Sequence, residues 1–464
     1  MQKSYLYLFL FFVFTGCISC QNYKYRDMEL YPIRENGLFG FVDTLGNKIV
    51  VPQYLCVSYF SNHLAAAVVD TFYEYRSDST LHKYGLDYAK EVNKRLYLNI
   101  RYGYINIENE FVIAPNLIRS FTVYEDNYKN VKTSDLQNCT NEVMFSEGLA
   151  PIQDSITLNY GFIDTLGIQR IPPIYYSYKN FSSGKAAVLL FKCNEGEPPS
   201  NFCFKWAYID KDGKPQSDFI YASLTSLVDG RSIGTIWSKA KVPDYLNDST
   251  DIDTTESEKS NDIESANSLQ YRISVLLDEN GKIINNSLPQ AYHYYDFNDG
   301  VARAELEHAE YFGKDFKFLD KNGNFLKPKK SNSNNPYLMG PSPDNIHFKD
   351  LTYMSEGYAG VKGPNGKWLF IDKDLNFYAP VNDIAYDDLY PFCNGLAAVC
   401  QNGKWGYVDK DFNIVIPFKY DWAGYAGKHL IQVRQEDKNS HIVIESLINR
   451  RDSVVWQYVE NKSK

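Results

Sequence analysis

The sequence predicts an all-β protein, built as an array of antiparallel β-hairpin repeats stacked as a curved solenoid. Three observations lead to this prediction. Aromatic residues make up 16% of the chain, they are mostly Tyr and Phe, which favour strands, and they follow no helical periodicity. A turn phrase recurs eight times along 464 residues, a length that exceeds one ordinary core. A second phrase, with alternating small apolar residues, precedes many copies of the first.

The turn phrase consists of strand residues, an Asp, two variable residues and usually a Gly. The Asp starts a type I turn by accepting a backbone hydrogen bond, and the Gly takes the left-handed conformation that closes the hairpin. Clear copies read FVDTLGN, FIDTLGI, YIDKDGK, LLDENGK and FLDKNGN, and weaker ones read YINIENE, FIDKDLN and YVDKDFN. We assign a structural turn role to seven acids: Asp43, Asp164, Asp210, Asp278, Asp320, Asp372 and Asp409.

The second phrase supplies the strand that comes before each hairpin. It begins with an aromatic residue or Met, reaches a Gly three residues later and continues in period-two alternation, as in FSEGLAPI and FCNGLAAV. This alternation predicts a strand with one buried face. The strand after the turn often ends at Pro, as in IVVP and IVIP, which suits a strand end or a sheet edge.

Joined together, the two phrases form one unit, best preserved over residues 392–421. The unit resembles the WG-containing repeat of bacterial proteins, and the Trp-Gly pair is Trp405-Gly406 here. Trp368 is followed by Leu and Trp206 by Ala, so these copies depart from the pattern. The resemblance extends over most of residues 31–425 and implies a repeat array without a common chemistry. A Trp buries a large area, and a Gly beside it lets a neighbouring backbone approach closely.

The arrangement of the units follows from their size. One hairpin unit is too small to fold alone, so successive units must stack to bury their apolar faces. A closed, propeller-like ring is the alternative to the curved solenoid, because seven or eight units would close a ring. Contact between the strands near residues 31–43 and the C-terminal strands would decide in favour of the ring.

Insertions divide the array. Residues 243–268 are rich in Asp, Glu, Ser and Thr, so they bury too little apolar area to fold and are expected to be disordered. They separate N-terminal repeats at residues 21–242 from C-terminal repeats at 269–428. Residues 429–464 are expected to form closing strands and a tail.

The first twenty residues predict export. An apolar run at residues 5–14 follows Lys3 and is too short to span a bilayer, as in a signal peptide. Cys17 and Cys20 each follow small residues in a way that resembles the lipobox of bacterial lipoproteins, and either could be the lipidated residue. The prediction is a lipoprotein signal peptide at residues 1–20 and a lipid-anchored protein of the cell envelope. A plain secretory signal is the alternative.

Export also permits disulfides. Cys193 and Cys203 bracket a turn-rich stretch between two strand-like runs, so they are candidates for a bond across a hairpin. Two free, buried thiols are the alternative.

The chain lacks the motifs that carry common chemistry. It has no phosphate loop, no nucleophile elbow and no His/Cys spacing suited to zinc, so we predict no cofactor, no metal site and no catalytic residue. A net charge of −9 argues against nucleic acid as the main partner.

We therefore expect a non-catalytic binding or scaffold module for an unidentified protein or glycan. The alternative is an envelope enzyme, such as a glycan hydrolase, with its site in the irregular segments near residues 119–141 or 219–245. Acids or His with shifted pKa values in one cleft, breaking the repeat symmetry, would favour the enzyme.

Overall fold

The computed structural model describes residues 30–77, 94–123, 142–192, 203–239, 270–306, 315–328, 348–363, 365–378, 385–437 and 439–461. The named elements within these ranges are all β-strands, and neighbouring strands pair in antiparallel fashion. The predicted all-β array of hairpins is therefore confirmed.

The described strands form eight sheets. Seven of them hold one repeat unit each. The eighth has seven strands and holds two units, joined by the single residue pair Trp206–Tyr221, so the described chain contains nine units.

The nine units follow the chain order. Units 1 to 3 consist of β1 (Tyr31–Glu35), β2 (Leu38–Val42) and β3 (Lys48–Tyr54); β4 (Cys56–Val57), β5 (Ala65–Ser77), β6 (Lys94–Ile105) and β7 (Phe111–Val123); and β8 (Leu149–Gln153), β9 (Tyr160–Asp164) and β10 (Gln169–Tyr175). Units 4 to 6 consist of β11 (Ser177–Tyr178), β12 (Ala186–Phe191) and β13 (Phe204–Ile209); β14 (Tyr221–Leu224), β15 (Ser232–Lys239), β16 (Gln270–Leu277) and β17 (Ile283–Asn285); and β18 (His293–Asn298), β19 (Val301–Leu306) and β20 (Asp315–Asp320). Units 7 to 9 consist of β21 (Asp350–Leu351), β22 (Ala359–Lys362), β23 (Trp368–Ile371) and β24 (Phe377–Tyr378); β25 (Asp388–Leu389), β26 (Leu396–Gln401), β27 (Lys404–Asp409) and β28 (Ile414–Tyr420); and β29 (Trp422–Ala423), β30 (Leu430–Asp437), β31 (Ile442–Asn449) and β32 (Val454–Asn461).

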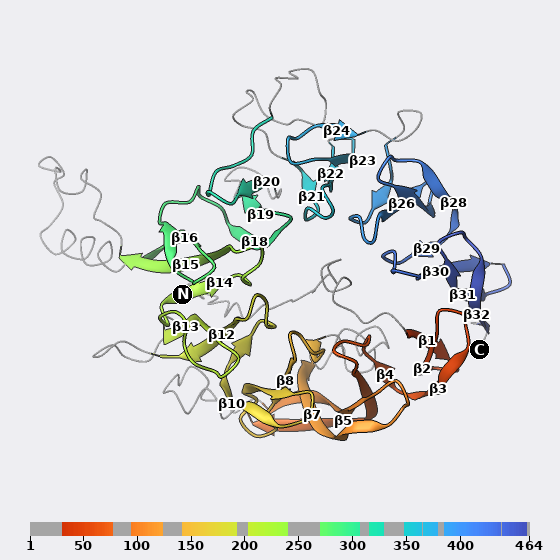
Figure 1. Cartoon of the computed structure of the whole chain (residues 1–464), viewed down its shortest axis with the longest axis horizontal. Helices are drawn as coiled ribbons and strands as arrows, with labels where there is room; N and C mark the ends of the chain where they lie inside the picture. The colour runs from red at the N-terminus through yellow and green to blue at the C-terminus, as the bar shows by residue number, and fades with distance from the viewer. Residues whose placement is uncertain are drawn as a thin grey trace, which may run out of the picture.

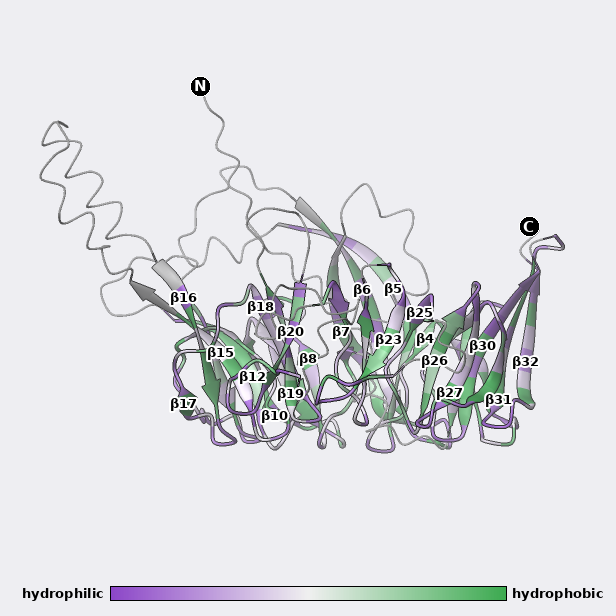
Figure 2. Ribbon diagram, turned by 90° about the horizontal axis from the view of Figure 1, so that it is seen from above, coloured by the Kyte–Doolittle hydropathy of each residue, from purple (hydrophilic) through white to green (hydrophobic). Residues whose placement is uncertain are grey.

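The units stand side by side around a ring (Figure 1). Short first strands such as β4, β21 and β29 lie towards the centre, and last strands such as β10 and β28 lie on the outside. Seen from its edge, the ring is a flat disc with the strands crossing its thickness (Figure 2). The inner strands form what we call the inner wall.

Contacts between the first and last units close the ring. The Tyr31 hydroxyl accepts hydrogen bonds from the N–H groups of His429 and Leu430, both at 3.1 Å. The Trp456 indole donates to the Glu35 carboxylate at 3.3 Å, and one apolar cluster includes Tyr31, Leu430 and Trp456. The units therefore form a closed ring, which was the alternative arrangement. The preferred prediction, a curved solenoid with separate ends, was wrong on this point. An open array would leave this apolar cluster in water.

The strand order gives the disc two different faces. Each turn acid lies between the long strand that carries the Trp-Gly position and the outer segment of its unit, so these turns share one face, the turn face. The other ends of the strands that lead into the turns lie on the opposite face, which we call the insertion face. The strands that flank residues 243–268, β15 and β16, therefore open onto the insertion face.

Several predictions concern residues outside the described ranges. These are the signal peptide with Cys17 and Cys20, the acidic segment 243–268 and Cys193. The domain boundaries stay predictions. Within the described ranges, no helix has the length and apolarity needed to cross a bilayer.

Candidate functional site

The seven predicted turn acids occupy one equivalent position in seven units. One carboxylate oxygen of each accepts hydrogen bonds from the N–H groups two and four residues later, at 2.8–3.0 Å. All seven side chains are partly exposed. At Asp43 the Asn47 side chain also donates, which lowers the pKa of Asp43. These acids are thus engaged in turns around the ring and are not gathered at one place.

Sequence reasoning missed the turn of unit 9. Asn449 takes the place of the acid and accepts from the N–H groups of Arg451 and Ser453, at 2.9 and 3.0 Å. Asp452 adopts the left-handed conformation that Gly supplies in five other units, with φ of 63°. The signal was weak because neither the Asp nor the Gly of the phrase is present.

We expect replacement of Asp409 by Ala to lower the free energy of unfolding by about 2 kcal/mol, because two hydrogen bonds to a charged acceptor are lost. The matched control is Asp411→Ala in the same turn, where the side chain is exposed. Urea unfolding of both variants measures the difference. Equal stabilities would show that the turn does not depend on the Asp409 carboxylate.

The three Trp residues of the repeat signature lie in the same register. In the strand pairing, Trp405 lies opposite Tyr420, Trp206 opposite Tyr221 and Trp368 opposite Tyr386. Each Tyr lies at or after the end of the outer segment that follows the Trp. All three indoles are buried. The Trp therefore packs inside its own unit, and its ring is not displayed to a ligand.

The Gly of the signature is required because the backbone of the outer strand lies very close to it. A Cβ on Gly406 would lie 2.5 Å from the Ile416 carbonyl oxygen, and Gly40, Gly103 and Gly161 are equally confined. Where Leu369 replaces the Gly, the outer strand β24 has only two residues. Where Ala207 replaces it, a single bridge between Ile209 and Pro215 takes the place of the outer strand. In these two units, a residue larger than Gly thus occurs where the outer strand is very short or replaced by a single bridge.

Neighbouring units are joined by carboxylates that sequence reasoning did not identify. Glu147, Asp229, Asp299 and Glu356 each accept a hydrogen bond from a Gly N–H of the next unit, at 2.8–2.9 Å. All four have positive φ values, between 48° and 55°. We call them the latch acids. The available signal was the acid that directly precedes Gly in phrases such as FSEG and FNDG.

Arg119 begins one of the irregular segments that the enzyme alternative requires. Its guanidinium carbon lies 4.9 Å from the centre of the Tyr160 ring and 5.7 Å from that of Tyr178. It donates to the Tyr178 hydroxyl at 2.9 Å and pairs with Glu142. Because these groups come from units 2, 3 and 4, the buried Arg119 holds three units together. The described part of this segment therefore contains a packing cluster.

Ionisable groups converge on the inner wall at units 4 to 6. The Lys179 ammonium lies 3.3 Å from the Asp296 carboxylate, which also accepts from the Ser226 N–H at 2.8 Å. Burial acts to raise the pKa of Asp296, but Lys179 and the Ser226 N–H more than offset it, so this pKa lies below its ordinary value. At the position of Asp296, unit 7 has Tyr353 and unit 8 has Pro391, so the cluster breaks the repeat symmetry.

Further groups extend this cluster. Tyr295 donates to the Glu305 carboxylate at 2.9 Å, and the Arg303 guanidinium carbon lies 3.9 Å from the centre of the Tyr295 ring. Burial lowers the pKa of His293, and the nearby Lys179 lowers it further, which favours a neutral imidazole. The arrangement offers charged and neutral polar groups for binding. No set of three candidate metal ligands occurs in the described residues.

The Asp296 pKa leads to a prediction about acid stability. Because it is lowered in the folded protein, Asp296 stabilises the fold above the ordinary Asp pKa of about 3.9, and this contribution is lost as the pH falls through the folded value. Asp296→Asn is therefore expected to destabilise the protein most at neutral pH, and the difference from wild type is expected to shrink below about pH 4. Urea unfolding at several pH values measures it, with exposed Asp212→Asn as control. A difference independent of pH would contradict the assignment.

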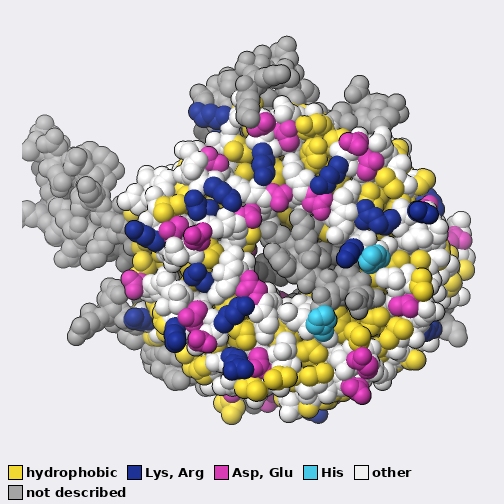
Figure 3. Space-filling model, viewed as in Figure 1, with side chains coloured by type: hydrophobic (Ala, Val, Ile, Leu, Met, Phe, Trp, Pro, Cys, Tyr) yellow, Lys and Arg dark blue, Asp and Glu magenta, His cyan; other side chains and the backbone are white. Residues whose placement is uncertain are grey.

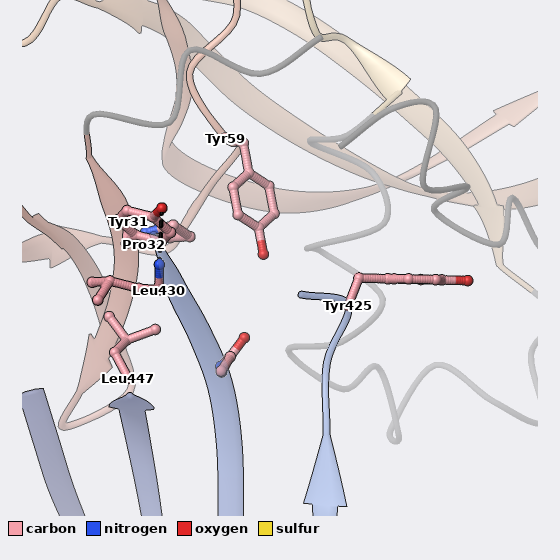
Figure 4. A pocket seen from close by; sticks show the side chains of 7 residues that line it. Tyr31, Pro32, Tyr59, Tyr425, Leu430 and Leu447 are labelled. Atoms are coloured by element: carbon pink, nitrogen blue, oxygen red, sulfur yellow. Dashed lines mark hydrogen bonds between the residues drawn. The ribbon is translucent and has the colours of Figure 1, made fainter. Parts of the chain in front are cut away.

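A small pocket lies where the ring closes (Figure 4). Tyr59 points into this space from unit 2, with Tyr31 and Leu430 beside it. Tyr425 of unit 9 also lines the pocket, but its ring extends away from Tyr59. The Tyr425 ring stacks on Tyr390 with their centres 5.1 Å apart. The lining has no charged side chain. It offers apolar contacts and hydrogen bonds to a ligand, but no Asp, Glu, His, Lys or Arg side chain for acid–base chemistry.

The cysteines fall into two groups. Cys203 and Cys393 each take part in a disulfide, whereas Cys56 and Cys400 are buried thiols. Because Cys193 lies outside the described residues, its bond to Cys203 stays a prediction.

The comparison with protein families gives three matches. The model of the WG containing repeat matches residues 160–190, 383–405 and 405–438. These segments are WG repeats. The WG repeats cover parts of units 3, 4, 8 and 9, and the third match begins at Trp405 itself. No curated protein matches the chain.

The chain is also similar to solved structures. One is a crystal structure of the eukaryotic initiation factor, with 9% identity, a TM-score of 0.38, and coverage of 94% of this chain and 86% of that one. Another is AztD of Citrobacter koseri, with 11% identity, a TM-score of 0.32 and coverage of 92% and 93%. Dipeptidyl peptidase 4 of Porphyromonas gingivalis has 9% identity, a TM-score of 0.39 and coverage of 94% and 59%. At these low scores, the fold assignment rests on the contacts of the ring itself.

Proposed function

We propose that this chain is a lipid-anchored, non-catalytic protein of the cell envelope whose ring of WG repeats holds a protein or glycan partner. The observation that carries the proposal is the uniform use of the turn acids. Each accepts the same two backbone hydrogen bonds, so the acids that recur at the same place in seven units serve the scaffold. A scaffold of this kind presents a surface, and its specificity lies in the residues that differ between units.

The distribution of charge supports a partner other than nucleic acid. On the face shown in Figure 3, Lys and Arg side chains are interspersed with Asp and Glu side chains. Many of the cations are paired with acids, including Lys404 with Asp421 and Lys410 with Glu356. Nucleic-acid binding requires a continuous surplus of cations along a surface, which this arrangement does not provide.

The test has two arms. Mass spectrometry of the mature protein, with and without inhibition of lipoprotein processing, shows whether Cys17 or Cys20 is acylated; acylation of neither would refute the anchor. Capture of partners from an envelope extract compares the full chain with a variant lacking residues 243–268, using Asp411→Ala on the turn face as control. We expect the control to retain its partner. Absence of any partner at native abundance would contradict the scaffold.

A glycan hydrolase remains the second candidate because of the inner-wall cluster. Glu305 is buried and accepts from Tyr295, and His293 with its lowered pKa lies nearby, as an acid–base site would require. Release of reducing sugar from envelope polysaccharide by the wild type, abolished in Glu305→Gln but kept in Asp411→Ala, would establish the enzyme. Absence of release would support the binding role.

A further inference from the structure

The outer edge of the ring carries exposed apolar residues near the turn face. We define the apolar rim as Leu45, Val51, Leu166, Ile168, Ile414 and Val454, whose side chains are between 51% and 79% exposed. Contiguous exposed apolar surface on a soluble fold marks an interaction site. The rim residues belong to units 8, 9, 1 and 3.

The turn tips show that the rim is specific to part of the ring. Leu45 and Leu166 occupy the second variable position of the turn phrase and are 79% and 70% exposed. Five other units carry Asp or Asn at this position: Asp212, Asn280, Asn322, Asp374 and Asp411. The turn itself therefore does not require Leu, and burial against a partner would give these two side chains a physical role.

Contacts between units place the rim residues on neighbouring parts of the ring. Lys419 of unit 8 pairs with Asp452 of unit 9 at 2.5 Å. Gly46 of unit 1 packs against the Val455 backbone of unit 9, since a Cβ there would lie 2.2 Å from the Val455 oxygen. Unit 2 joins units 1 and 3, through the ring contact of Tyr54 with Phe111 at 6.1 Å and through Ile113, which packs against Gly167. Units 8, 9, 1, 2 and 3 thus follow one another around the ring (Figure 1).

The start of the described chain lies at the same end of unit 1. Tyr31 pairs with Val42, which directly precedes the turn acid Asp43, so the chain enters unit 1 at the turn face. Leu30 follows Cys20 by 10 residues and Cys17 by 13. A fully extended chain of these lengths reaches at most about 36 or 47 Å. A lipid attached to either cysteine would therefore hold this end of the ring near the membrane.

We propose that the apolar rim rests on the phospholipid surface to which the chain is anchored, an inference that depends on the lipid anchor of the proposed function. Three cations next to the rim are paired with acids: Lys48 with Glu35 at 2.7 Å, Arg170 with Asp164 at 2.7 Å and Lys419 with Asp452. Arg451, at the turn tip of unit 9, is exposed. Because most of the nearby charge is paired, the proposed contact is mainly apolar and depends little on salt or on anionic lipid.

The test places one nitroxide label on the full, lipidated chain in vesicles of zwitterionic phospholipid. The labels are introduced by Leu45→Cys and Leu166→Cys on the rim, and by Asp212→Cys at the matched turn tip of unit 4. We expect the labels at residues 45 and 166 to collide with oxygen dissolved in the lipid and to be shielded from a water-soluble nickel complex. The label at residue 212 is expected to behave in the opposite way, and added salt to change neither pattern.

Each other outcome is informative. Protein that co-floats with vesicles but whose rim labels behave like the label at residue 212 overturns the rim contact and leaves the anchor standing. Protein that does not co-float overturns the anchor and the rim contact together. Spin–spin coupling between rim labels of two molecules assigns the rim to a second copy and also overturns the proposal. A Leu45→Asp, Leu166→Asp variant is expected to keep its melting temperature and to stay vesicle-bound while its rim loses lipid contact.

Discussion

Replacing Gly406 by Ala is expected to lower the free energy of unfolding by about 3 kcal/mol, at the upper end of the cost of overpacking. The added Cβ would lie 2.5 Å from the Ile416 carbonyl oxygen and 3.0 Å from the Phe418 nitrogen. Both atoms belong to the backbone of β28, so no side-chain rotation can relieve the clash. Either β28 moves away from β27 or the bulge between them is lost. Urea and thermal unfolding measure the loss.

Gly403 provides the matched control in the same hairpin. Its φ of 72° is unfavourable for Ala, but no atom lies within 4 Å of the added Cβ. Gly403→Ala is therefore expected to cost only about 1 kcal/mol, through the left-handed conformation alone. Equal effects of the two substitutions would show that close approach of the outer strand is not the reason for the Gly in the WG repeat.

Replacing Trp456 by Ala is expected to lower the free energy of unfolding by about 3–5 kcal/mol and to open the ring. Trp456 is 9% exposed, packs in a cluster shared by the first and last units, and donates to Glu35. Its removal leaves a cavity where the two ends of the chain meet. Unfolding measures the stability, and limited proteolysis within β1 and β32 measures the opening.

The control for this change is Val459→Ala on the same strand, where the side chain is 53% exposed. An exposed truncation of this kind is expected to change the stability by less than about 0.5 kcal/mol. Destabilisation by Trp456→Ala without faster cleavage of β1 would mean that the ring stays closed through the remaining contacts of Tyr31.

The sequence was sufficient to predict features that depend on a few neighbouring residues. The turn of Asp409 is set within five positions, because the acid bonds to N–H groups two and four residues later. The role of Gly406 was also predicted, since a Gly beside a large Trp indicates that a neighbouring backbone approaches closely at this point. Ring closure could not be predicted in this way. It depends on the angle between units, which the packing of Tyr31, Leu430 and Trp456 determines across the whole chain length.

The candidate sites illustrate the same limit. The pairing of Lys179 with Asp296 joins residues 117 positions apart, and nothing local to either residue indicates it. Arg119 lies in a segment without a clear repeat phrase, yet it is held by Tyr160, Tyr178 and Glu142 from the next two units. The latch acids were visible in the sequence, but their partners are Gly N–H groups of another unit, and backbone donors have no sequence signature.

Closure by direct contact between the two ends has a consequence for how such a chain can change in evolution. Adding or removing one unit of a nine-unit ring would alter the angle at every interface, including those joined by the latch acids and Arg119. Lengthening a loop between two strands alters none of them. Variation in length should therefore accumulate within units rather than in their number, and comparison of related chains would show a constant count of turns with insertions of unequal size between β5 and β6 or between β15 and β16.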